Sequence, residues 1–478
     1  MMIKKSLIGL SAATIALIFT GCSVKINKLT KEEINQSVQK NMAELKKNDD
    51  PITGALSLDE AIVRATQNNR DHRIKVLEKE FRKQELLISE DGMLPALNAQ
   101  GGITHRDNVL ASRSKNIFTG EQSYDYSTST DNTQKTAEAR VSWNALDFGL
   151  SYVRAQEDAD RVLIACEDQR KVEHQIQQDV REAYWKAVSA QNLLIQINPV
   201  VEKVRASIKE SNELEATLTG NIMDSLSFRR EMLDILISLQ NLKRDLLTAK
   251  PRLAVLMGLT PDTQFTLSDE MSEENIQSYQ CDIEKMEQIA FQKRPELMKS
   301  RYEARIAVQE TKSVMYSMFP GISFDAGVNY SSNSYTYNNS WYDYGMRVNM
   351  NLFKVFGYKH LKERAKFGEE IAKEQQNAVG MAVLTQVHLA VIRYKEALEQ
   401  WDATNQYYHV TNRISDITRA SNVNNLSSKQ QVARDELSKL IANVKRDMAY
   451  AEVQNSFGGI YESVGLQHNS KDIEKVMK

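Results

Sequence analysis

The chain repeats itself, and this internal duplication limits the possible folds more than any other feature of the sequence. The stretch that begins at Asn69 aligns without a gap with the stretch that begins at Arg294. In that alignment Pro95 meets Pro320, and in both copies a helical pattern runs into the proline before an alternating pattern begins. A solenoid needs several short repeats, so two long copies predict a duplicated, pseudo-symmetric half instead.

Further matches indicate how far each copy extends. The motif NLKRD at Asn241 resembles NVKRD at Asn443, and each precedes a predicted helix end, at LMGL (256–259) or FGGI (457–460). Each copy is therefore predicted to contain a helix, two strands, a very long helix, a turn and a returning helix. The predicted organisation is a signal peptide (1–21), an N-terminal linker (22–56), a first repeat (57–260) with strands 95–107 and 136–147 and a helical hairpin 149–258, a connecting segment (261–283), a second repeat (284–460) with strands 321–332 and 341–354 and a helical hairpin 357–458, and a C-terminal tail (461–478).

Four segments alternate between apolar and polar residues, and the clearest is AEARVSWNAL, residues 137–146. Such a strand fits either a half-buried position on a soluble core or a membrane barrel with one face toward lipid and one toward water. Four strands cannot close a membrane barrel, and an open sheet in lipid would leave backbone groups unsatisfied at its edges. If these strands span a membrane, several chains must contribute, and three copies would supply twelve strands.

The helical segments carry apolar residues at coiled-coil spacing. Ile197, Val201 and Val204 follow a 4–3 spacing, and the returning segment continues it with Leu239, Leu242, Leu246, Ala249 and Leu253. This pattern predicts two long helices that pack against each other along one seam.

The N-terminus has the pattern of a targeting segment. Lys4 and Lys5 precede an apolar run from Leu7 to Phe19, which is typical of a secretory signal peptide. The following FTGC resembles a bacterial lipobox, which would make Cys22 the lipidated first residue of the mature protein. An ordinary signal peptide with an incidental cysteine is the alternative. Ser23 stands where a retention signal for the inner membrane would have Asp, which favours the outer membrane.

Composition and motifs exclude several classes of function. The formal charge of −2 gives no sign of a nucleic-acid surface, and a mean hydropathy of −0.48 without a long apolar run after the N-terminus excludes a helical membrane protein. Metal-binding, nucleotide-binding and hydrolase motifs are absent from the sequence, so neither a cofactor nor an enzymatic activity is predicted. Cys166 and Cys281 form no CxxC pair.

Residues 57–460 resemble the TolC-like outer-membrane factors. The helix–strand junctions MLPALNAQG and MFPGISFDAG look like those of that family, as do WNALDFG and NLFKVFG where strands lead into long helices. The first helix opens with LSLDEAIVRATQNN, and Asn69-Arg70-Asp71 stands where members commonly have Asn-Pro-Glu. Arg294-Pro295-Glu296 in the second copy is closer to that pattern.

The resemblance implies a fold class, a location and partners. The fold would be mainly α with a transmembrane β-barrel portion: a homotrimer with a twelve-stranded barrel in the Gram-negative outer membrane on a long α-helical periplasmic tunnel. The protein would be a passive exit duct, lipid-anchored, that joins a periplasmic adaptor and an inner-membrane pump of the RND or ABC type. Its cargo, small molecules or type I secreted proteins, depends on that pump.

The implied topology places Cys166 and Cys281 at different heights of the tunnel, roughly 30 Å apart along its axis, so we predict two unpaired thiols.

The resemblance also implies roles for particular residues. Charged strand residues would face a watery lumen, and aromatic ones would form girdles at the membrane interfaces. The turns 218–227 and 420–429 would form the periplasmic tip, where the adaptor docks and the pore constricts. Some members close the pore with a ring of aspartates, whereas the matching positions here are neutral; an alignment shifted by a few residues would place Asp435 in the ring instead. The lumen set is Glu138, Arg140, Asp325, Asp343 and Arg347; the girdle set is Trp143, Trp341, Tyr342 and Tyr344; the tip set is Gly220, Asn221, Asn422 and Asn424; and the constriction set is Ser428, Gln431 and, in the shifted alignment, Asp435.

Two other classes of function stay open at this level. A periplasmic coiled-coil lipoprotein with a structural role would need no pore. An enzyme with a metal in the acidic stretch 266–285 is the other, although a solvated loop explains that stretch more simply.

Overall fold

The computed structural model describes residues 27–46, 52, 54–216, 222–268, 271, 276, 279, 281–423 and 429–467. The chain divides into two units, Met1–Pro51 and Ile52–Lys478. The described part of the first unit holds the helix α2 (Lys31–Lys46), which exposes Ile34, Val38 and Met42 along one side. The predicted signal peptide and Cys22 lie outside the described residues.

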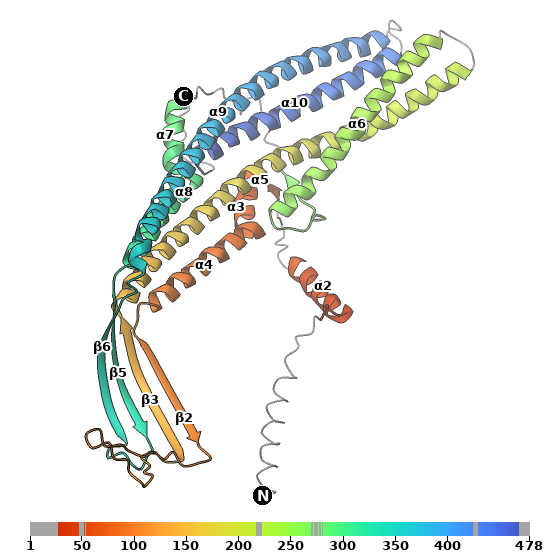
Figure 1. Ribbon diagram of the computed structural model, residues 1–478. Helices are drawn as coiled ribbons and strands as arrows, with labels where there is room; N and C mark the ends of the chain where they lie inside the picture. The colour runs from red at the N-terminus through yellow and green to blue at the C-terminus, as the bar shows by residue number, and fades with distance from the viewer. Residues whose placement is uncertain are drawn as a thin grey trace. The chain divides into compact units, whose positions relative to one another are not determined.

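The second unit contains the duplication (Figure 1). The first copy comprises α3 (Leu58–Asn68), α4 (Arg70–Asp91), β2 (Ala96–His105), β3 (Thr133–Asn144), α5 (Ala145–Ala216) and α6 (Ile222–Leu256). The second comprises α7 (Ile283–Lys293), α8 (Pro295–Tyr316), β5 (Gly321–Ser331), β6 (Ser340–Asn349), α9 (Lys354–Val423) and α10 (Lys429–Val464). Corresponding helices match in length: α4 and α8 each have 22 residues, and α5 and α9 have 72 and 70.

Local chemistry sets where the shorter helices begin. The side chain of Ser57 accepts a hydrogen bond from the Glu60 amide at the start of α3, and Asp282 does the same for α7. Asn69 caps α4 in this way as well. At the corresponding point of the second copy Arg294 makes no side-chain cap, and α8 instead begins with Pro295, whose missing N–H needs no partner in the first turn.

The long helices form two antiparallel hairpins, α5–α6 and α9–α10, and α10 also packs against α5. The seam predicted from the 4–3 spacing is confirmed, since Ile197, Val204 and Leu239 are buried in the core between α5 and α6. Near the strands, α8 packs against both α5 and α9, and α4 packs against α5. The short helices α3 and α7 lie against α5 and α9, and a two-stranded parallel sheet of β1 (Ala55–Leu56) and β4 (Thr266–Leu267) adjoins α5.

The second hairpin is longer than predicted. The glycines of FGGI lie inside α10, which continues beyond 458 to Val464. The chain turns instead at Gly465, which has a φ of 72°, as Gly258 does in the first copy with a φ of 77°. Sequence comparison therefore paired the wrong glycines. MGL at 257–259 corresponds to VGL at 464–466, because Gly258 and Gly465 adopt the left-handed conformation that ends a helix, whereas the glycines of FGGI do not.

The four predicted strands form one antiparallel sheet in the order β2-β3-β5-β6. It lies at one end of the second unit, at the N-terminal ends of α5 and α9 and away from their C-terminal ends (Figure 1). The strand predicted to reach 354 ends at Asn349. Among the described strands, β2 and β6 each have one neighbour in this sheet, so both outer edges are free within the chain. No described helix is both long and apolar enough to cross a membrane.

Candidate functional site: the polar face of the sheet

The strand register brings all five residues of the predicted lumen set to one face of the sheet. Arg140 lies opposite Gly327, which lies opposite Asp343. Successive side chains point to opposite faces of a strand, so residues an even number of positions away share this face. These include Glu138, Asp325 and Arg347.

The other face is apolar and largely exposed. It carries the cross-strand aromatic pair Trp143 and Phe324, whose ring centroids are 6.1 Å apart, and Tyr342 and Tyr344, which are 83% and 90% exposed. No described element covers this face. An exposed apolar surface of this extent marks a site that meets a membrane or another protein.

Trp341 does not belong to this apolar face. It lies opposite Asn329, which lies opposite Glu138, so its side chain is on the polar face. The assignment of Trp341 to a lipid-facing girdle was therefore wrong. It is two residues from Asp343, and the two-residue period of a strand places both on the same side.

The Arg140 guanidinium organises the polar face. It donates a hydrogen bond of 2.8 Å from Nη2 to Asp343 Oδ2 and one of 3.2 Å from Nη1 to Asp325 Oδ2, and its Nε contacts Glu138. Gln100 from β2 donates to Glu138, and Asn329 from β5 donates to Asp343. This Arg140 network thus links all four strands of the sheet.

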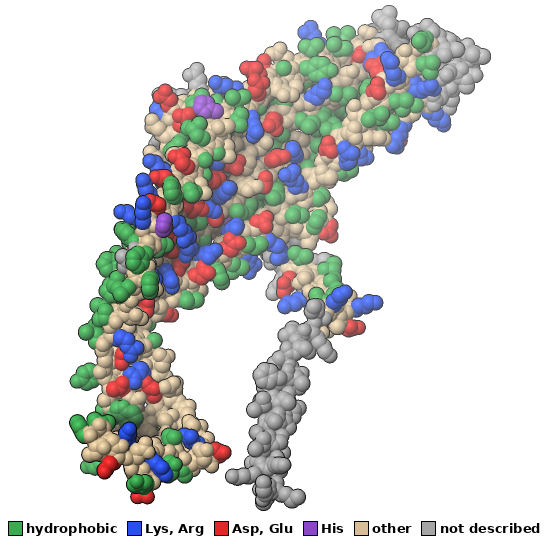
Figure 2. All heavy atoms as spheres, in the orientation of Figure 1, with side chains coloured by type: hydrophobic (Ala, Val, Ile, Leu, Met, Phe, Trp, Pro, Cys, Tyr) green, Lys and Arg blue, Asp and Glu red, His purple; other side chains and the backbone are tan. Residues whose placement is uncertain are grey.

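Two glycines make room for the Arg140 network. A Cβ at Gly327 would lie 3.0 Å from Asp343 Oδ1 and 3.1 Å from Arg140 Cζ. A Cβ at Gly345 would lie 3.2 Å from Asp325 Oδ2. The charged groups therefore lie flat against the sheet backbone instead of extending away from it. They remain in contact with solvent, since the Arg140 side chain is 29% exposed. Figure 2 shows blue and red side chains together on the visible face of the strands.

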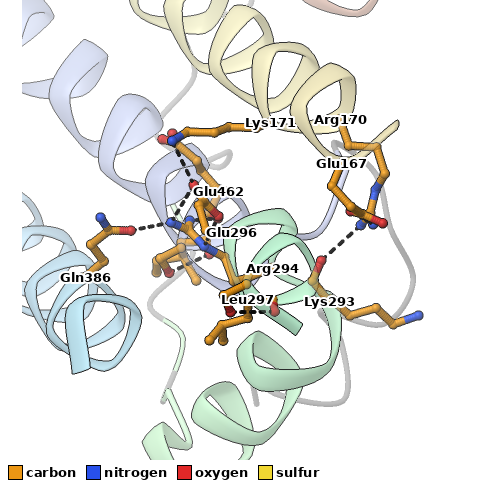
Figure 3. A network of polar contacts seen from close by, with 12 residues as sticks. Glu167, Arg170, Lys171, Lys293, Arg294, Glu296, Leu297, Gln386 and Glu462 are labelled. Carbon is orange, nitrogen blue, oxygen red and sulfur yellow. Dashed lines mark hydrogen bonds and ion pairs between the residues drawn. The ribbon is translucent and has the colours of Figure 1, made fainter. Parts of the chain in front are cut away.

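A second polar network surrounds Arg294, at the junction where α7, α8, α9 and α10 meet (Figure 3). Arg294 Nη1 donates a 2.7 Å hydrogen bond to the backbone oxygen of Glu462, and its Nε lies 3.1 Å from Glu296. The guanidinium also contacts Gln386 of α9. Arg170 of α5 donates a 2.9 Å hydrogen bond to the backbone oxygen of Lys293. Sequence reasoning did not identify this Arg294 network, which connects α5, α7, α8, α9 and α10. Arg294 at its centre is only 6% exposed.

Burial perturbs the titration of groups around Arg294. The pKa of His174, on α5, is lowered to about 4, mainly by burial and further by the positive charges of Arg170 and Arg294. The pKa of Glu462 is raised, mainly by burial, even though Arg294 opposes that effect. The low-dielectric surroundings thus favour the neutral form of both groups.

The helical layer has a polar side as well. Lys171, Gln178 and Glu182 of α5 line a cleft of about 710 Å³ between α5, α8, α9 and α10. Val180 and Tyr184 of the same helix are buried in the core that α5 shares with α3. At 100° per residue the two sets lie on opposite sides of α5, so the cleft opens away from α3.

The predicted tip and constriction lie partly outside the described residues. Gly220, Asn221, Asn424 and Ser428 are among those that are not described, and Asn422 is placed only as part of α9. Gln431 and Asp435 lie in the first turns of α10, where the Asp435 carboxylate accepts hydrogen bonds from Thr418 Oγ1 at 2.6 Å and from Gln431 Nε2 at 3.1 Å. Asp435 is only 8% exposed, and its carboxylate is directed toward α9.

Chemistry that would indicate an enzyme is not visible in the described part of the chain. There, no group of three or more His, Cys, Asp or Glu could hold a metal ion. The acidic stretch 266–285 is described only in part. Cys166 and Cys281 are both free thiols.

Comparison with known proteins relates this architecture to solved channels. No protein-family model and no curated protein matches the chain. The structure is similar to that of the Neisseria gonorrhoeae MtrE outer membrane channel in its open state, with a TM-score of 0.67 and 14% identity over 86% of this chain and 89% of that one. It is similar to the Campylobacter jejuni CmeC outer membrane channel, with a TM-score of 0.66 and 14% identity over 95% and 93% of the two chains. For the outer membrane protein VceC of Vibrio cholerae the TM-score is 0.63, with 12% identity over 85% and 96%. The chain therefore has the fold of these outer-membrane channels, as the resemblance of its motifs to the TolC-like factors predicted.

Proposed function

We propose that this protein, which has the fold of outer-membrane channels, is the outer-membrane exit duct of an export system and acts as a homotrimer. The observation that carries the proposal is the sheet. One face is apolar and exposed, the other holds the Arg140 network, and each edge strand pairs with only one other described strand. Backbone groups at a bare edge in lipid would each cost several kcal/mol, so β6 must pair with β2 of a neighbouring copy. Three copies joined head to tail would close a twelve-stranded barrel.

The outer helices support the same ring. α6 packs mainly against α5, and it leaves Leu233 and Ile237 exposed on its other side. On α9 the residues Val410, Ile414 and Ile417 are 59%, 48% and 58% exposed at 4–3 spacing, although they lie on a helix whose inner side already packs against α10. Each lateral side of the helical layer therefore presents an apolar seam, which suits a coiled-coil contact between α9 of one copy and α6 of the next.

The polar and apolar faces give the barrel its orientation. The apolar face would contact lipid, with Trp143, Tyr342 and Tyr344 suited to the interfaces, and the polar face would line a water-filled lumen. Glu138, Arg140, Asp325, Asp343 and Arg347 are then lumen residues. The polar cleft along α5, on the side away from α3, would continue this lining into the tunnel.

Further parts of the proposal concern residues at both ends of the protein. Lipidation of Cys22 would anchor the N-terminus, and labelling with a palmitate analogue should be lost in Cys22→Ser. Gly220, Asn221, Asn422 and Asn424 would form the tip that meets a periplasmic adaptor, which in turn joins an inner-membrane pump of the RND or ABC type. The pump would decide whether small molecules or proteins pass.

We propose a neutral constriction at the tip, formed with Ser428 and Gln431. The bonds from Thr418 and Gln431 to Asp435 support this, because they hold that carboxylate between α9 and α10. If block of the pore by multivalent cations from the periplasmic side were strong and were abolished by Asp435→Asn, the neutral constriction would be wrong.

The test of the duct itself is made on full-length protein extracted from the outer membrane. We expect a heat-modifiable trimer on electrophoresis and stepwise conductance when it is added to a planar bilayer. Replacement of residues 106–132, the loop between β2 and β3, by a two-residue Asn-Gly turn should leave both properties intact and serves as the control. A monomer without conductance would support the structural lipoprotein instead.

A further inference from the structure

We infer that the Arg140 network sets the charge preference of the pore, with its carboxylates attracting cations and Arg140 limiting that attraction. The inference rests on the proposed function, because it requires the polar face of the sheet to line a lumen. It concerns a region distant from the tip, where the constriction is proposed.

The charges of the polar face follow one another along the strands in register. Glu138 and Asn329 share one row across the strands, and Arg140 and Asp343 share the next row. Asp325 lies in the third row, and Arg347 lies in the fourth, nearest the helices. Three carboxylates and two guanidinium groups leave a net charge of −1 on this face of each chain. Three copies arranged in a ring would triple that excess around one lumen.

One guanidinium cannot neutralise the carboxylates that it contacts. Arg140 touches Glu138, Asp325 and Asp343, so the Arg140 network itself has a surplus of two negative charges. No ion pair joins Arg347 to any described carboxylate, and it lies in the row of Ser323, beyond Asp325. An ion that passes the sheet would therefore meet an acidic layer whose single internal cation is Arg140.

The glycines determine where this charge lies. Because Arg140 rests over Gly327 and Asp325 over Gly345, the charged groups lie against the wall and leave the lumen open. Charges fixed on a low-dielectric wall act on mobile ions within about 8–10 Å at physiological salt. The Arg140 network is thus built to bias ions by charge, whereas a constriction would need side chains that extend across the pore.

The opposite face supplies a matched control on the same strand. Lys135 lies opposite Ile103 and shares the apolar face of β3, five positions before Arg140. Lys135→Gln and Arg140→Gln each remove one positive charge from β3. Only Arg140→Gln changes the charge of the face that is proposed to line the lumen.

The experiment measures reversal potentials of the full-length trimer in planar bilayers under a gradient of KCl. The wild type should prefer K⁺ over Cl⁻. Arg140→Gln should raise the permeability ratio by about twofold. The double variant Asp325→Asn, Asp343→Asn removes two charges and turns the net charge of the face from −1 to +1, so it should lower the ratio by about fourfold and favour Cl⁻. Arg140→Lys should behave as the wild type, since it keeps the charge, and Lys135→Gln should have no effect.

The outcomes separate the inference from the function on which it rests. Equal ratios in the wild type, Arg140→Gln and the double variant would overturn the inference and leave the duct intact. A similar shift in Lys135→Gln would also overturn it, because the side of the sheet would then not matter. Absence of channels in the wild type would overturn the duct and the inference with it.

Discussion

Arg140 and Arg294 each organise a network of carboxylates and amides, but in opposite surroundings. The Arg140 network lies on an open sheet face, with the Arg140 side chain 29% exposed, whereas Arg294 is 6% exposed at a junction of four helices. A glycine lies against both: Gly327 under the Arg140 side chain and Gly465 against the Arg294 backbone. The difference teaches that the same residue type serves two purposes. Where water screens the network, its charge is available to ions; where water is excluded, its partners hold helices together.

The largest effect is expected from Arg294→Met. The change would leave the Glu462 carbonyl and the side chains of Glu296 and Gln386 without their buried donor, and breaking such a network costs about 3 kcal/mol of the free energy of unfolding. Urea unfolding followed by circular dichroism would measure it. Arg82→Met, which removes an exposed pair with Glu85, should cost no more than about 0.5 kcal/mol. Equal costs in the two variants would show that the Arg294 network does not hold the junction.

Gly465→Ala should have the next largest effect. Gly465 has a φ of 72°, and a Cβ there would lie 2.9 Å from both the N and the Cα of Arg294. The left-handed conformation and this backbone contact together should cost about 2 kcal/mol in the same urea experiment. Gly459→Ala is the matched control, because it lies within α10 with open space around its Cβ. It should stabilise the helix by about 0.5 kcal/mol, and a comparable loss there would contradict the assignment of the helix end.

His174 should make the junction sensitive to acid. Since its pKa falls from 6.5 to about 4 on folding, the unfolded chain binds a proton between these values that the folded chain does not bind. Stability should therefore fall as the pH is lowered from about 6.5 toward 4. Relative to its own stability at pH 7, the wild type should lose roughly 2 kcal/mol more at pH 5 than His174→Gln loses. The raised pKa of Glu462 acts in the opposite direction, but it is common to both proteins and cancels in the difference. Parallel pH profiles for the two proteins would rule out a buried neutral His174.

Arg140→Met should have the smallest effect on stability. The side chains of the Arg140 network keep contact with water, so the loss should be well below that of Arg294→Met even though three carboxylates lose their cation. Thermal dissociation of the trimer would measure it beside Arg294→Met. A loss as large as that of Arg294→Met would mean that the polar face of the sheet is dry, and this would contradict its place in a lumen.

Features that repeat within one segment were predictable. Alternation along residues 137–146 predicted that Glu138 and Arg140 share a face, and the 4–3 spacing predicted the buried seam of Ile197 and Val204. The same alternation, applied to Asp343, would have placed Trp341 correctly. These patterns are readable because a strand repeats every two residues and a helix every 3.6, whatever the rest of the chain does.

By itself, the sequence determined the duplication, the two faces of the sheet and the seams of the long helices. Only the tertiary structure decided that Arg140 contacts Asp343, 203 residues away, and that Arg294 holds the end of α10 at Glu462, 168 residues away. It also decided that α10 continues through FGGI to Val464, since Gly465 and not Gly459 meets the Arg294 backbone. The physical reason is that periodicity depends on neighbours in one segment, whereas the partners of a charge and the end of a helix depend on register and packing between segments that are distant in the chain.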